Sequence, residues 1–166
     1  MNVSNQLLNE IISCPKTIIR AERKKMILEN RHYRNTLNAI SNNQKYTFKI
    51  FLRQSDEFLE DFSVGLIWTN PQNIIGINRP IIMLRCQGPH DGKEELGFDI
   101  HHDFHTHEIT EKDILERRFH RPSCRQNTTL FQSFDQALCY FIKRCDIIDI
   151  EKFIDFPDNF EQLTLF

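Results

Sequence analysis

The chain has 166 residues, the length of one average domain, and 40% of them are apolar, enough for one sizeable hydrophobic core. The net charge is −2, so the chain lacks the high overall positive charge by which many proteins bind nucleic acid. Any anion site therefore has to be a local patch. The five cysteines are irregularly spaced and form no C-x-x-C pair, which predicts neither a disulfide framework nor a zinc ribbon.

Two helices are predicted at the N-terminus. Apolar residues between 7 and 12 fall at helical spacing and indicate the first helix. Pro15 ends that helix and is predicted to open a second one, because proline is tolerated in the first turn of a helix. The apolar residues Ile18, Met26 and Ile27 continue the helical pattern.

Several segments in the middle of the chain are predicted to be strands. The segment 32–40 is either a strand that pairs with the next one or a helix. Apolar and polar residues alternate over 46–53, which is typical of a half-buried strand. The segments 62–69 and 80–87 indicate further strands, and 98–107 is the last candidate.

Two helix starts follow the predicted strands. Thr110, with Asp113 three residues later, is typical of the N-cap of a short helix. Ser133 and Gln136 form a capping box, and the apolar residues over 134–145 keep helical spacing behind it. This last helix is expected to pack across one face of the sheet.

The predicted fold class is α+β, in a single domain over 1–166. It consists of N-terminal helices, a four- or five-stranded antiparallel sheet and a C-terminal helix packed on the sheet. The tail over 146–166 alternates acidic with apolar residues. It is expected either to pack on the core or to serve as an arm that binds a partner.

The segment 99–107 holds four histidines within seven residues. Alternate residues of a strand share a face, so one side is expected to carry His101, Asp103, His105 and His107. The other side, with Ile100, His102, Phe104 and Thr106, is mostly apolar and is expected to face the core.

Three interpretations of this histidine segment stay open. The first is an exposed strand that is rich in histidine by composition alone. The second is a metal site, in which the H-x-H pair is joined by His101, Asp103 or His90. The third is acid–base chemistry on a phosphodiester, since histidine acts as both acid and base near neutral pH.

Arginines surround the histidine segment. Arg85 ends the preceding strand, and a basic segment with one aromatic residue follows, comprising Arg117, Arg118, Phe119, Arg121 and Arg125. Arginine stabilises charge that develops on phosphoryl oxygens, and the ring of Phe119 is predicted to stack on a base. A solvated loop explains the same segment equally well.

The order of the motifs resembles a family of small bacterial proteins that share a domain of unknown function. The residues that carry this resemblance are Phe-Leu-Arg53, Phe-Ser-Val-Gly-Leu66, Leu-Arg-Cys-Gln-Gly-Pro-His90 and His105-Thr-His107. Arginine before Gly-Pro-His, the later histidines and a final Phe-rich helix also resemble TumE-type toxins of toxin–antitoxin modules. This second resemblance implies a protein that acts on RNA, is held by an antitoxin protein, and uses Arg85, His90, His102, His105 and His107.

Together these features predict a bacterial toxin-like protein that acts on RNA as a metal-independent endoribonuclease without a cofactor. The predicted catalytic residues are His105, His107, His90, His101 and Arg85. The predicted substrate-binding residues are Arg117, Arg118, Phe119, Arg121 and Arg125. Within the first set, His105 and His107 are assigned as acid and base.

Two other function classes stay open: a non-catalytic binding or regulatory module of a toxin–antitoxin or phage-defence system, and a protein that binds metal through the histidine strand. The expected partners are RNA, an antitoxin protein and, in a homodimer, a second copy of the chain. No secretion signal and no apolar run of membrane-spanning length is evident. The expected location is therefore the cytoplasm.

Overall fold

The computed structural model describes residues 3–89 and 103–155. The strands are β1 (Lys16–Ala21), β2 (Ile27–Glu29), β3 (His32–Ser41), β4 (Thr47–Ser55), β5 (Phe62–Trp68), β6 (Ile81–Gln87), β7 (His105–Glu108), β8 (Cys124–Asn127) and β9 (Ile147–Ile148). The helices are α1 (Asn5–Ser13), α2 (Gln72–Ile75), α3 (Glu111–Leu115), α4 (Phe134–Cys145) and the 3-10 turn η1 (Ile150–Lys152).

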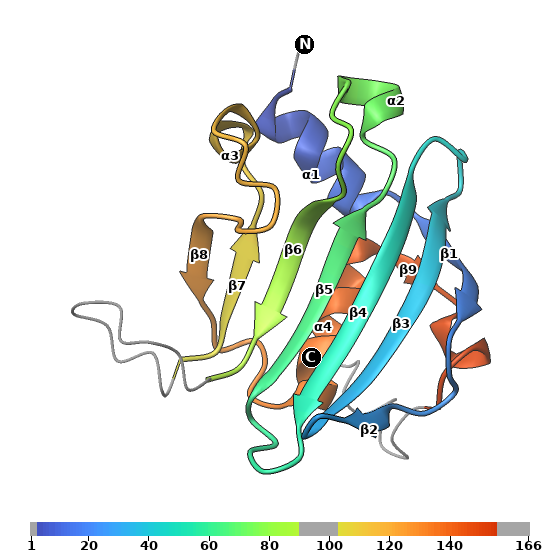
Figure 1. Ribbon diagram of the computed structural model, residues 1–166, viewed down its shortest axis with the longest axis vertical. Helices are drawn as coiled ribbons and strands as arrows, with labels where there is room; N and C mark the ends of the chain where they lie inside the picture. Colours follow the sequence, from blue (N-terminus) through green and yellow to red (C-terminus); the bar gives the residue numbers. More distant parts are fainter. Residues whose placement is uncertain (1–2, 90–102, 156–166) are drawn as a thin grey trace.

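One mixed sheet contains all nine described strands (Figure 1). Their order is β8-β7-β6-β5-β4-β3-β1-β9, and β2 pairs with β3 beside this path. The pairing is antiparallel except between β1 and β9, which run parallel. The predicted antiparallel sheet of four or five strands is therefore wrong. The strands that the prediction lacked are β1, β2, β8 and β9. The last three are only two to four residues long, and segments of that length show no readable periodicity.

The predicted pair of N-terminal helices is also wrong. Helix α1 is present, but β1 follows it where the second helix was expected. Lys16 and Ile18 are buried while Thr17 is exposed, which is the alternation of a strand. The register then shifts between Ile18 and Arg20, so Ile19 adds an apolar residue that breaks the alternation and imitates a helical pattern.

The predicted C-terminal helix is present as α4. The hydroxyl of Ser133 accepts a hydrogen bond from the backbone N–H of Gln136 at 3.2 Å, as its N-cap position requires. Helix α4 contacts β5 and β6, and α1 contacts α4 and β6. In Figure 1 both helices lie behind the sheet. The face that they cover carries the apolar core, including Leu37, Phe48, Ile50, Leu52, Phe62, Val64, Leu66 and Cys86.

Lys16 fastens the helical layer to the sheet. Its side chain is fully buried, and its ammonium group donates to the carbonyls of Ile12 and Cys14 at the end of α1. It also donates to the carbonyl of Cys145 at the end of α4, at 2.7 Å. Helix ends leave such carbonyls without partners, so one cation here satisfies both helices. Burial lowers the pKa of Lys16.

The first part of the C-terminal tail packs on the core. Strand β9 pairs with β1, and Ile147, Ile150 and Ile154 are buried. Residues 156–166 lie outside the described part of the chain. Because both long helices occupy one face, the opposite face of the sheet has no helical cover within residues 3–89 and 103–155. We call it the open face.

Candidate functional site

The two histidines of β7 lie on the open face. Thr106, between them, lies on the helical face opposite Cys86, and the ring of Phe104 stacks on Phe62 with centroids 6.1 Å apart. The predicted separation of His105 and His107 from Phe104 and Thr106 is therefore present, but in the described part of the predicted strand 98–107 the strand begins only at His105. His90, His101 and His102, which the prediction placed in the same site, lie outside the described residues.

The register of the ladders aligns residues from six strands on the open face into two rows. The first row is Thr36, Phe51, Gly65, Arg85, His107 and Arg125. The second row is Arg34, Arg53, Ser63, Gln87, His105 and Asn127. Directly opposed residues have Cβ atoms only about 4.5–5.5 Å apart. The structure thus places the predicted base His107 between two of the predicted arginines.

The open face is basic although the chain as a whole is not. Its strand positions hold Arg20, Arg34, Lys49, Arg53, Arg85 and Arg125. Among the described strand residues, Glu29 is the only carboxylate whose register places it on this face. The open face is therefore the local basic patch on which an anion site would have to lie, since the net charge of the chain is −2.

His107 is half-buried, and its Nδ1 lies 3.1 Å from the carbonyl oxygen of Pro122. A carbonyl oxygen only accepts hydrogen bonds, so Nδ1 carries the proton of this contact. In the neutral imidazole the basic nitrogen is consequently Nε2. With its proton on Nδ1, the ring can accept a substrate proton on Nε2, as a general base does.

His105 is fully buried, and its Nδ1 lies 2.9 Å from the carbonyl oxygen of Asp103. Its ring packs edge-on against His107, with centroids 5.0 Å apart and planes at 84°. A buried ring does not meet a substrate that arrives from solvent. Of the two histidines, His107 is the one placed to contact such a substrate.

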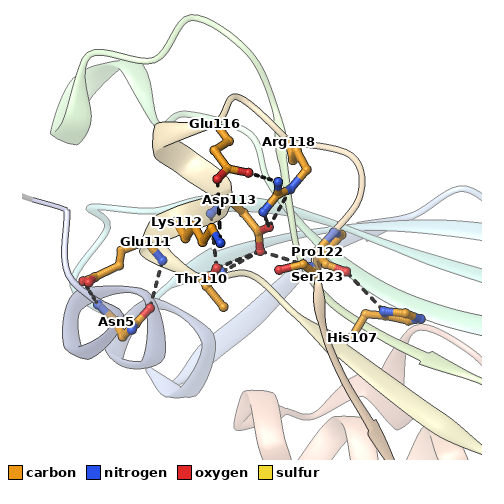
Figure 2. Close-up of polar contacts among 10 residues, drawn as sticks. All are labelled: Asn5, His107, Thr110, Glu111, Lys112, Asp113, Glu116, Arg118, Pro122 and Ser123. Atoms are coloured by element: carbon orange, nitrogen blue, oxygen red, sulfur yellow. Dashed lines mark hydrogen bonds and ion pairs between the residues drawn. The ribbon is translucent and has the colours of Figure 1, made fainter.

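Asp113 holds the peptide that anchors His107 (Figure 2). Its buried carboxylate accepts hydrogen bonds from the N–H of Ser123 at 3.1 Å and from Nε of Arg118 at 3.0 Å. It also accepts from the backbone N–H and the hydroxyl of Thr110, both at 3.0 Å, and so closes the capping box of α3.

The N–H of Ser123 and the carbonyl of Pro122 belong to the same peptide unit. Asp113 therefore binds one side of this peptide and His107 binds the other. This peptide therefore links the carboxylate of Asp113 to Nδ1 of His107 and holds the imidazole in one orientation. Burial raises the pKa of Asp113, but the hydrogen bonds from Ser123, Arg118 and Thr110 outweigh it and leave that pKa below its ordinary value.

The predicted substrate-binding segment divides into separate roles. Arg118 forms ion pairs with Asp113 and Glu116. Phe119 is only 2% exposed and belongs to the core, so in this structure its ring does not lie where a base stacks. Arg117 and Arg121 are exposed outside the two rows, and only Arg125 of this segment stands in a row, opposite His107.

The sequence interpretation missed the other half of the open face. Arg34, Phe51, Arg53 and Gln87 line a hollow of about 390 Å³ beside Arg85. A signal for Phe51 and Arg53 was present, because they fall on the same side of β4 as Lys49. Their link to the histidine strand depends on the order of β4, β5, β6 and β7, which the sequence does not show.

Within the described residues, no group of three or more His, Cys, Asp or Glu side chains is placed to hold a metal ion. The predicted metal site with Asp103 as the added ligand is thus not found, whereas His90 and His101, the other two predicted ligands, lie outside the described residues. With either of those two as a ligand, the metal site is still a prediction.

No protein-family model matches the chain, and neither a curated protein nor a solved structure does. The resemblance to TumE-type toxins therefore stays a prediction. In the part of the chain that the structure describes, no helix is long and apolar enough to cross a membrane. Function has to be argued from the site, because a fold alone does not specify one.

Proposed function

We propose that the protein binds RNA on its open face and cleaves it without a metal ion, with His107 as the general base. The observation that supports this proposal best is the row Arg85–His107–Arg125 on the open face. It combines a base whose tautomer is fixed with two cations on neighbouring strands. Arginines in such positions stabilise negative charge on a phosphoryl group.

The reaction uses the ribose as its own nucleophile. Nε2 of His107 takes the proton of a 2′-hydroxyl, whose oxygen forms a bond to the adjacent phosphorus as the bond from phosphorus to the 5′-oxygen breaks. The leaving 5′-oxygen takes its proton from water, since His105 is buried. The products are a 2′,3′-cyclic phosphate and a 5′-hydroxyl, and Arg85 and Arg125 stabilise the charge on the phosphoryl oxygens in between.

The remaining parts of the proposal depend on the resemblance to TumE-type toxins. They are an antitoxin protein as partner, a homodimer as the assembly and the cytoplasm as the compartment. A second candidate function is RNA binding without cleavage. The burial of His105 favours it, because among residues 3–89 and 103–155 the histidine next to His107 is not exposed to donate a proton to the leaving group.

The test is cleavage of a 5′-labelled single-stranded RNA by the full-length protein in excess EDTA. We expect cyclic phosphate ends, and a loss of rate of at least about 10²-fold in His107→Gln, since general acid–base catalysis contributes about 10²–10⁴-fold. The matched control is His120→Gln, which removes an exposed histidine outside the two rows and keeps the wild-type rate. RNA that is bound and left intact supports the second candidate, and RNA that is neither bound nor cut, with or without divalent metal, contradicts both.

A further inference from the structure

The hollow beside Arg85 has the size of a ligand site. Its volume of about 390 Å³ lies in the range of roughly 300–1,000 Å³ that is usual for small-molecule sites. Arg34, Phe51, Arg53, Ser63, Arg85 and Gln87 line it. It spans β3 to β6 and ends one strand away from His107.

Phe51 provides an aromatic surface in this hollow. Its ring crosses β5 over Gly65, where an added Cβ would lie 2.1 Å from Cζ of the ring. The missing side chain of Gly65 therefore lets the ring lie against the sheet. The ring is half-buried, and the guanidinium of Arg85 lies over it, 5.8 Å from its centroid. An accessible aromatic ring on an open sheet face is the usual platform for an unpaired base.

Of the three arginines that line the hollow, only Arg53 forms an ion pair with a described carboxylate. Arg53 pairs with Asp61 at 3.0 Å, whereas Arg34 and Arg85 form no ion pair with any described residue. Nε of Arg85 is buried without a hydrogen-bond partner among residues 3–89 and 103–155. Burial lowers the pKa of Arg85, and the charge of Arg53 lowers it further.

The guanidinium groups that line the hollow are hydrogen-bond donors without acceptor atoms, so they favour a ligand that brings acceptors. An anion also relieves the repulsion between Arg53 and Arg85. Phosphate oxygens supply both the acceptor and the charge, and arginine binds them in bidentate fashion. On β6, two residues after Arg85, the half-buried amide of Gln87 offers a neutral donor and acceptor for the edge of a base.

From these contacts we infer that the hollow is a subsite for one unpaired nucleotide of a single-stranded RNA, with the base on Phe51, one phosphate on Arg34 and the next phosphate on Arg85. This inference depends on the proposed function, because it places the strand so that the next phosphodiester reaches His107. It also excludes duplex RNA as the substrate, since the bases of an A-form helix are stacked and do not enter a hollow of this kind.

The test measures the affinity of the full-length protein for a fluorescent 12-nucleotide single strand and for the blunt duplex of the same sequence. We expect the single strand to bind more tightly, and Phe51→Leu to weaken its binding by about 5- to 150-fold, the range found when one stacked base is lost. Phe51→Tyr retains the ring and is expected to bind as the wild type does. Phe58→Leu, which removes an exposed ring in the turn before β5, is the matched control.

Arg34→Gln is a second variant and changes an exposed side chain, so the fold is not at risk. It should lower affinity for the single strand and reduce the salt dependence of binding by about one counterion. Equal affinity for duplex and single strand, or unchanged binding in Phe51→Leu, would overturn the subsite while cleavage by the wild type continued. A wild type that neither binds nor cuts RNA would overturn the proposed function as well.

Discussion

Replacing Asp113 by asparagine tests whether one buried carboxylate both stabilises the fold and orients His107. The carboxylate accepts two hydrogen bonds from Thr110, one from Ser123 and one from Arg118. Asparagine removes the charge and turns one acceptor atom into a donor that faces another donor. Hydrogen bonds to a charged group contribute about 1.5–3 kcal/mol each, and a broken buried ion pair costs about 3–5 kcal/mol.

Solvent reduces that cost here, because the side chain of Arg118 is 37% exposed. We therefore expect Asp113→Asn to lower the free energy of unfolding by about 2–4 kcal/mol, measured by urea denaturation. Glu116→Gln is the matched control, since Glu116 pairs with the same arginine at an exposed site, and it should cost no more than about 1 kcal/mol. Equal losses in the two variants would refute the role of Asp113 as a buried hub.

The pH dependence of the same variant gives an independent check. The pKa of Asp113 lies below its ordinary value of 3.8 in the folded protein, so its ionised form stabilises the fold above that value. That stability is lost as the pH falls from about 3.8 through the folded pKa. We expect the wild type, but not Asp113→Asn, to show this component of acid destabilisation in urea titrations between pH 5 and pH 2.5.

In the cleavage assay, Asp113→Asn should lower kcat by about 10-fold with little change in KM, since it loosens the Pro122–Ser123 peptide without touching the binding hollow. A purely structural role predicts instead that activity falls only in proportion to the unfolded fraction. A kcat equal to that of the wild type at a temperature where both are folded would refute the positioning argument.

Three further predictions concern other parts of the molecule. Lys16→Met should lower the free energy of unfolding in urea denaturation by about 2–4 kcal/mol, because three helix-end carbonyls lose a charged donor. A change below about 0.5 kcal/mol would show that Lys16 does not hold the two helix ends together. Gly65→Ala should weaken binding of single-stranded RNA about as much as Phe51→Leu does, because the new Cβ displaces the ring of Phe51; wild-type affinity would show that the position of the ring is unimportant. Burial raises the pKa of Cys145 to about 12. A disulfide reagent at pH 8 should therefore modify the exposed Cys124 first and leave Cys145 intact until the protein unfolds. Peptide mass spectrometry that finds Cys145 modified in the folded protein would contradict its burial.

The face that carries the site was predictable from local sequence. Alternation over 103–107 separates His105 and His107 from Phe104 and Thr106, and the structure keeps that separation. Their partners were less accessible, because Arg125 reaches His107 only through β8, a strand of four residues. The burial of His105 was also not predicted, since alternation specifies a side of the sheet and not the depth of a side chain.

Other errors have equally local causes. Phe119 stands among arginines and was interpreted as an exposed ring, but its backbone carbonyl accepts from the N–H of Ile82 and the ring fills the core. Asp113 was identified as a helix cap, and its contact with Ser123 depends on how the loop returns to β8. Asp113 and Ser123 are 10 residues apart, and the loop between them has no periodic pattern from which their contact could be predicted.

The most direct test of the central claim uses a DNA oligonucleotide that contains one ribonucleotide, incubated with the full-length protein in EDTA. If His107 activates a 2′-hydroxyl, the wild type cuts only on the 3′ side of the single ribose and leaves a 2′,3′-cyclic phosphate, which mass spectrometry identifies. His107→Gln should leave the oligonucleotide intact, and His120→Gln should cut it at the wild-type rate. Cleavage at deoxyribose positions, or equal cleavage by His107→Gln, would contradict the assignment of His107 as the base.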